Sequence, residues 1–119
     1  MARIERSDGW PASGTVDTLQ VALNAFFKKH KMRVIGKQAG EMHVRQGFPR
    51  LARWLHGHFM PQRWLPKRAM VRLNRGETGI AVRACIEETT SFRKLSPHLE
   101  SKYRTYFDWW MDELRSQIR

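Results

Sequence analysis

Few side chains in this sequence combine the residue type and the spacing that catalysis or metal binding requires. His56 and His58 bring two imidazoles close together, but no Cys, Asp or Glu lies near them in the sequence to complete a metal site. Cys85 has no partner that the sequence identifies, so we expect a structural thiol rather than a nucleophile. Glu87 and Glu88 are adjacent on an expected strand and point to opposite faces, so they cannot act as a pair. The sequence thus predicts a protein that is not an enzyme, with no cofactor and no metal site.

The chemistry that the residue pattern does favour is attachment to a surface. In an insert at about 48–68, Arg and Lys alternate with large apolar side chains. Aromatic rings of this kind lie at the depth of lipid headgroups while the cations meet anionic lipids, each cation contributing roughly 1 kcal/mol. The residues that we expect to contact a membrane or a partner are Arg50, Arg53, Trp54, Phe59, Arg63, Trp64, Lys67 and Arg68.

Two other interpretations of this insert stay open. Trp and Arg are favoured at the centres of protein interfaces, so the insert also suits an acidic protein partner. Alternatively, its apolar side chains fold back and join the core, namely Trp54, Leu55, Phe59 and Trp64.

A second group of cations lies on expected strands, on the face that points away from the core. A rigid face with charges of one sign would bind phosphate groups, with an affinity that falls steeply with salt. These cations are Arg33, Lys37, Arg45, Arg72 and Arg83, with His43 beside them. Nucleic acid or a ribosome-associated partner is therefore the alternative to a membrane. The simplest interpretation is a basic face without any ligand.

Charge is concentrated in one part of this 119-residue chain, whose formal net charge is +11. The stretch from Lys28 to Arg75 contains thirteen Lys or Arg and one acidic residue, while the remainder is close to neutral. Such a charge attracts polyanions over long range. A single cysteine, no apolar leader and no apolar run of roughly 20 residues favour one cytoplasmic domain spanning 1–119, at the inner face of a membrane if the insert docks there.

The elements that must position these residues follow from hydrophobic spacing. We expect a strand at 3–7, a turn-rich segment at 8–14, and a helix capped by Thr15 or Ser13 that carries Val16, Leu19, Leu23, Phe26 and Phe27 inward. Two hairpins follow, with turns at 38–40 and 76–79, and a short helix lies at about 51–59 between them. A long helix runs from Leu99 to about Ile118, with the apolar stripe Leu99, Tyr103, Phe107, Trp110, Leu114 and Ile118.

Alternation along the strands indicates which residues face the core. In the first hairpin Met32, Val34 and Gly36 would face one side and Arg33, Ile35 and Lys37 the other. Alternation on one face only is typical of an antiparallel sheet with one face covered. We therefore predict an α+β fold, with a sheet of four to five strands covered on one face by the N-terminal helix and the long C-terminal helix.

In outline, this order resembles the START-like, or helix-grip, domains. The parallels are the first strand, the Pro11-Ala-Ser13 turn before a helix, the segment Gly79–Glu88 and the long C-terminal helix. The resemblance implies a carrier of a small apolar ligand, held between the sheet and the long helix. Tyr106, Phe107, Trp109 and Trp110 lie where such a ligand would sit and are able to fill that space.

Membrane attachment through the insert predicts a specific loss of binding. Trp54→Ala combined with Trp64→Ala removes the apolar groups that enter the headgroup region, so pelleting with anionic liposomes is expected to fail even at low salt. Binding to short RNA should survive the same change. Pelleting that is unchanged in the double variant would contradict this interpretation.

Overall fold

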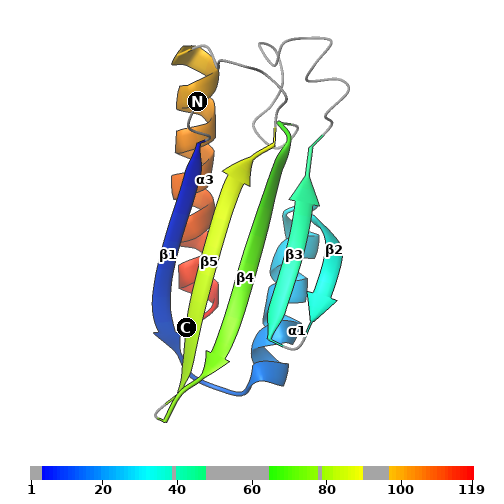
Figure 1. Cartoon of the computed structure of the whole chain (residues 1–119), viewed down its shortest axis with the longest axis vertical. Coiled ribbons are helices and arrows are strands. Elements are labelled where there is room, and N and C mark those ends of the chain that lie inside the picture. Colours follow the sequence, from blue (N-terminus) through cyan, green and yellow to red (C-terminus); the bar gives the residue numbers. More distant parts are fainter. Residues whose placement is uncertain (1–3, 39, 48–64, 78, 90–96) are drawn as a thin grey trace.

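The computed structural model describes residues 4–38, 40–47, 65–77, 79–89 and 97–119. Within these residues five strands form one antiparallel sheet, in the order β1-β5-β4-β3-β2, and two helices lie on one of its faces (Figure 1). The elements are β1 (Glu5–Ala12), α1 (Val16–Lys29), β2 (Arg33–Gln38), β3 (Glu41–Gln46), β4 (Lys67–Arg75), β5 (Ile80–Glu88) and α3 (Pro97–Gln117). The predicted α+β fold, with one covered sheet face, is confirmed. The short helix predicted at about 51–59 lies outside the described residues.

α3 supplies the largest part of the core. It packs against β1 and β5, while α1 packs beside β2 and touches α3. The predicted apolar stripe of α3 is confirmed, because all of its residues are buried: Leu99, Tyr103, Phe107, Trp110, Leu114 and Ile118. Trp110 donates from its indole N–H to the sulfur of Met32, 3.2 Å away, and so joins α3 to the chain that follows α1.

β1 is longer than predicted. Its pairing with β5 runs without interruption from Glu5 opposite Glu87 to Ala12 opposite Ile80, so the segment expected to be a turn is mostly strand. Pro11 is tolerated because β1 is an edge strand, where a missing N–H need not break a ladder. Trp10 is buried, and its indole N–H donates to the carbonyl oxygen of Ile118. Cross-strand pairing and the burial of one large ring therefore outweigh the turn preferences of this segment.

Both ends of α1 have hydrogen-bonded caps. Thr15 is the N-cap, and its side chain and that of Thr18 accept from each other's backbone N–H groups, forming a capping box. At the other end Met32 N–H donates to Phe27 O at 2.8 Å and Lys31 N–H donates to Lys28 O at 3.2 Å. This is the Schellman arrangement, in which the residue after the cap adopts a left-handed backbone. Lys31 occupies that position with φ 57°.

A β-bulge in β2 changes the predicted faces of that strand. The register shifts between Val34 and Gly36, so Gly36 lies opposite His43 and Lys37 lies opposite Met42. Residues directly opposite each other share a face. Lys37 is therefore on the helix-covered side and Gly36 on the other, the reverse of the prediction, because an extra residue at Ile35 breaks the two-residue alternation.

The left-handed backbone at Lys31 generates a stability prediction. A residue other than glycine in this conformation destabilises the folded state by about 1–2 kcal/mol. Glycine removes this strain, but part of the gain is lost because glycine makes the unfolded chain more flexible. Lys31→Gly should therefore raise the free energy of unfolding by roughly 0.5–1 kcal/mol. Urea denaturation measures it, with Lys29→Gly in the last turn of α1 as the control, which should be destabilised. A destabilised Lys31→Gly would contradict the assigned backbone.

Candidate functional site

The face of the sheet opposite the helices is uncovered in the described part of the chain (Figure 1). Alternate residues of β1, β3, β4 and β5 point to this face, which we call the outer face, and their neighbours in the sequence point to the side that the helices cover. β2 follows the same pattern apart from the bulge at Ile35. The inward residues of β4 and β5 are buried while most of the outward ones are exposed. The side chains of the outer face are therefore available to a partner.

Arginines form two parallel rows across the outer face. The first arginine row consists of directly opposed residues on β2, β3 and β4, namely Arg33, Arg45 and Arg68. The second arginine row lies on β4 and β5 and consists of Arg72 and Arg83. The rows are four residues apart along β4, from Arg68 to Arg72, which is about 13 Å. Like charges directly opposite each other on neighbouring strands repel, so each row destabilises the sheet in the absence of anions.

Carboxylates neutralise part of this charge, so the expectation of a patch of one sign is wrong. Glu41 accepts two hydrogen bonds from Arg72, at 3.0 and 3.2 Å, and lies 2.6 Å from Nε2 of His43. The hydrogen bonds from His43, and secondarily from Arg72, lower the pKa of the Glu41 carboxyl below its usual value. Glu87 pairs with Arg68. Within the described residues Arg33, Arg45 and Arg83 have no acidic partner.

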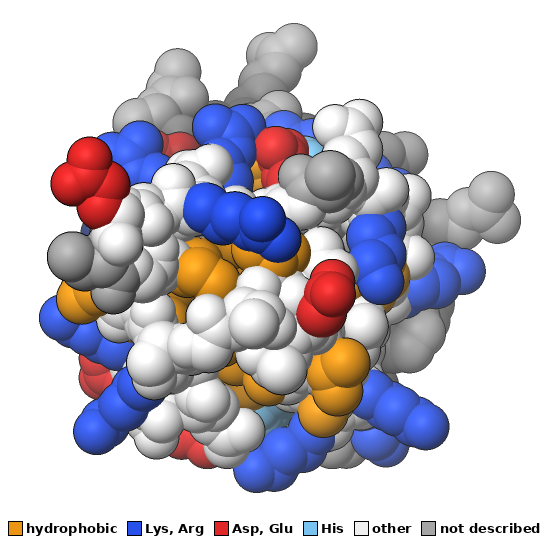
Figure 2. Space-filling model, turned by 90° about the horizontal axis from the view of Figure 1, so that it is seen from below, with side chains coloured by type: hydrophobic (Ala, Val, Ile, Leu, Met, Phe, Trp, Pro, Cys, Tyr) orange, Lys and Arg blue, Asp and Glu red, His pale blue; other side chains and the backbone are white. Residues whose placement is uncertain are grey.

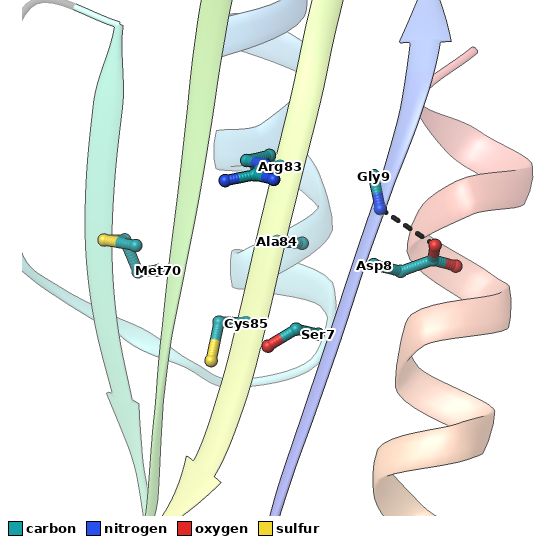
Figure 3. A pocket seen from close by; sticks show the side chains of 7 residues that line it. All are labelled: Ser7, Asp8, Gly9, Met70, Arg83, Ala84 and Cys85. Carbon is teal, nitrogen blue, oxygen red and sulfur yellow. Dashed lines mark hydrogen bonds between the residues drawn. The ribbon is translucent and has the colours of Figure 1, made fainter.

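A row of mostly small or sulfur-containing residues separates the two arginine rows. This middle row runs through five directly opposed residues, namely Gly36, His43, Met70, Cys85 and Ser7. Two adjoining depressions of about 610 and 330 Å³ lie along it and share Met70 and Cys85. Figure 3 shows the larger depression, with Cys85 and Ser7 side by side on β5 and β1. The outer face is therefore a shallow trough with guanidinium groups on both sides.

This chain shares its fold with a crystallised protein. The crystal structure of protein MLL2253 from Mesorhizobium loti matches it with a TM-score of 0.60 over 96% of each chain, at 11% sequence identity. At this identity the likeness shows the fold alone. No protein-family model matches the chain, and no curated protein matches it.

The structure brings together most of the predicted polyanion-binding residues. Arg33, Arg45, Arg72 and Arg83 all lie on the outer face, whereas Lys37 lies on the opposite side because of the bulge at Ile35. Of the predicted membrane-contacting or partner-contacting residues, Arg68 joins the first arginine row and Lys67 is buried. The others lie outside the described residues and stay predictions: Arg50, Arg53, Trp54, Phe59, Arg63 and Trp64.

Lys67 belongs to a buried polar cluster that sequence reasoning missed. Lys67, Gln46 and Glu88 are directly opposed on the core side of β3, β4 and β5, and all are buried. The Lys67 ammonium lies 3.3 Å from the Gln46 side-chain oxygen and 4.3 Å from the centre of the Tyr106 ring. The Tyr106 hydroxyl donates to the same Gln46 oxygen at 2.8 Å. The sequence does contain a sign of this burial, because Lys67 alternates with the inward-pointing residues Ala69 and Val71 along β4.

Burial also shifts the acidity of these groups. Desolvation lowers the pKa of Lys67 to about 7 and raises the pKa of Tyr106 to about 12. Burial, aided by the negative charge of Glu88, raises the pKa of Tyr103, whose hydroxyl donates to the carbonyl oxygen of Pro66 at 2.8 Å. The cluster thus holds one lysine that changes charge near neutral pH.

Two further observations concern other kinds of function. In the described part of the chain no group of three or more His, Cys, Asp or Glu is arranged to hold a metal ion. Among the described helices, none combines the length and the apolar character needed to cross a membrane. Tyr106, Phe107 and Trp110 of α3 are buried, while Trp109 is 44% exposed. The resemblance to START-like domains stays a prediction.

The lowered pKa of Lys67 makes stability depend on pH. Below about pH 7 the side chain is charged in both states, and the folded state bears the cost of a buried ammonium. As the pH rises from about 7 toward 10.5, only the unfolded chain keeps the proton, so the free energy of unfolding should rise by up to about 1.4 kcal/mol per pH unit. Lys67→Met should remove this rise and stabilise the protein at about pH 6.

Urea denaturation between about pH 6 and pH 9 measures this effect. Arg68→Met is the matched control, since it removes a neighbouring cation from the outer face and should keep the pH dependence. Parallel pH profiles for the original chain and Lys67→Met would contradict the assignment.

Proposed function

We propose that this protein is a non-enzymatic binding protein that attaches to nucleic acid through the outer face. The observation that carries the proposal is the pair of arginine rows on a sheet face that neither of the described helices covers. Three of these arginines, Arg33, Arg45 and Arg83, have no acidic partner in the described part of the chain.

Phosphate groups would relieve the repulsion within the rows. A guanidinium group presents paired N–H donors that match two phosphate oxygens, so arginine binds phosphate with geometry as well as with charge. Each phosphate that is neutralised also releases condensed counterions, which favours binding at low salt. The net charge of +11 would guide such a polyanion toward the protein from a distance.

The same face suits a flat lipid surface less well. A membrane-binding face needs apolar groups that stand above its cations and enter the headgroup layer. Here Met70 and Cys85, between the arginine rows, are half-buried and line depressions. Of the apolar side chains that line the two depressions, only Ile35, on the edge strand β2, is more than half exposed. Of the eight residues expected to attach the insert at about 48–68 to a membrane, six lie outside the described part, Lys67 is buried and Arg68 pairs with Glu87. The described geometry therefore gives more support to nucleic acid.

Neutralising the unpaired arginines tests the proposal. Arg33→Gln, Arg45→Gln and Arg83→Gln combined should weaken binding to a short RNA at least about tenfold and lower the slope of log affinity against log salt by about 2. Fluorescence anisotropy at several salt concentrations measures both. The matched control is Lys28→Gln, Lys29→Gln and Lys31→Gln, which removes the same charge from exposed positions at the end of α1 and should weaken binding less.

The outcomes separate the competing interpretations. Equal weakening in both triple variants would show that only net charge matters and would contradict the assignment to the outer face. Binding to anionic vesicles that RNA does not compete for, and that Trp54→Ala with Trp64→Ala abolishes, would replace nucleic acid with a membrane.

A further inference from the structure

The outer face is hollowed where β1 meets β5. On β1 the outward residues next to Cys85 and Arg83 are Ser7 and Gly9, which are small and exposed. The depression of about 610 Å³ lies here, with Met70, Arg83 and Cys85 among the residues that line it. Asp8 also lines the depression, but Figure 3 shows its carboxylate turned toward α3, where it accepts from Arg115 at 3.1 Å. The depression therefore presents uncharged groups beside a single arginine.

These groups suit a planar aromatic ring. The sulfur atoms of Met70 and Cys85 are polarisable and make favourable contacts with aromatic rings. The Ser7 hydroxyl can donate or accept a hydrogen bond at the ring edge. The guanidinium group of Arg83 can stack on a ring or bind a phosphate next to it. An uncharged heteroaromatic ring attached to a phosphate chain matches all of these features.

The spacing of the arginine rows relates this depression to the sugar-phosphate backbone of a bound nucleic acid. The middle row lies one two-residue step from each arginine row, so a ring over Met70 and Cys85 has cations on both sides of it. In a duplex the bases are paired and stacked inside, and phosphates alone would reach the rows. An unpaired base is free to enter the depression while its neighbouring phosphates meet the arginines.

We propose that the depression lined by Ser7, Met70 and Cys85 seats an unpaired base, so that the outer face selects single-stranded nucleic acid. This inference rests on the proposed function, which concerns the phosphate backbone alone. It adds the substrate class and a place for one base.

Two probes with the same backbone separate the base from the phosphates. One is a short oligothymidylate, and the other is an abasic oligomer of equal length, with the same charge and no bases. A contact between a sulfur atom and an aromatic ring is worth about 0.3–1.5 kcal/mol, so two such contacts should make the original chain bind oligothymidylate at least about threefold more tightly. Fluorescence anisotropy at one fixed salt concentration measures the ratio.

Filling the depression should abolish that preference. The missing Cβ of Gly9 would lie 3.4 Å from the Val82 carbonyl oxygen and 3.7 Å from Cγ of Arg83, which are ordinary contacts, so Gly9→Leu places a side chain there without backbone strain. Ser7→Leu fills the same depression from an exposed position and serves if Gly9→Leu is destabilised. Ala81→Leu is the matched control, since it adds a side chain to the outer face of β5 outside both depressions.

Each outcome decides one point. Loss of the preference in Gly9→Leu and Ser7→Leu, but not in Ala81→Leu, supports the inference. Equal binding of both oligomers by the original chain, or a preference that survives in the filled variants, overturns the inference and leaves the proposed function standing. Failure to bind either oligomer overturns both.

Discussion

Burial of only one face of the sheet is the constraint on which the rest of this structure depends. Because α1 and α3 lie on the same side, β1, β3, β4 and β5 turn alternate residues to that side and leave the others on one continuous surface. The buried inward side chains of β3, β4 and β5 are apolar apart from the cluster around Lys67, so a slip of one residue would bury arginines and expose the core. The same register that forms the core therefore places Arg45 beside Arg68 and Arg72 beside Arg83.

Much of the fold could be predicted from the sequence, because its main elements have strong periodic patterns. The stripe of α3 and the cap at Thr15 are local signals, and both are found in the structure. β1 was underestimated because the pairing that makes Gly9 and Pro11 part of a strand comes from β5, far along the chain. The bulge at Ile35 has no distinct local signal, and it moved Lys37 off the predicted face.

The candidate site was predictable in its residue types but not in its arrangement. Alternation alone places Arg45, Arg72 and Arg83 on one face. Their neighbours follow from the strand order β1-β5-β4-β3-β2, which no local pattern encodes. For that reason the carboxylates of Glu41 and Glu87 among the arginines, and the trough between the rows, emerged only from the structure. For Lys67 the two sequence signals conflict, because its charge favours a surface position while its alternation with Ala69 favours the core.

The central claim is that the outer face contacts the nucleic acid. The most direct test is to titrate an isotopically labelled sample with a short single-stranded oligonucleotide and to follow backbone amide resonances by NMR. Contact through the outer face predicts that the largest shifts fall in β3, β4 and β5 at the arginine rows and the middle row, with little change in α3. Shifts confined to the helices or to the segment at 48–64, with β4 and β5 unaffected, would contradict it.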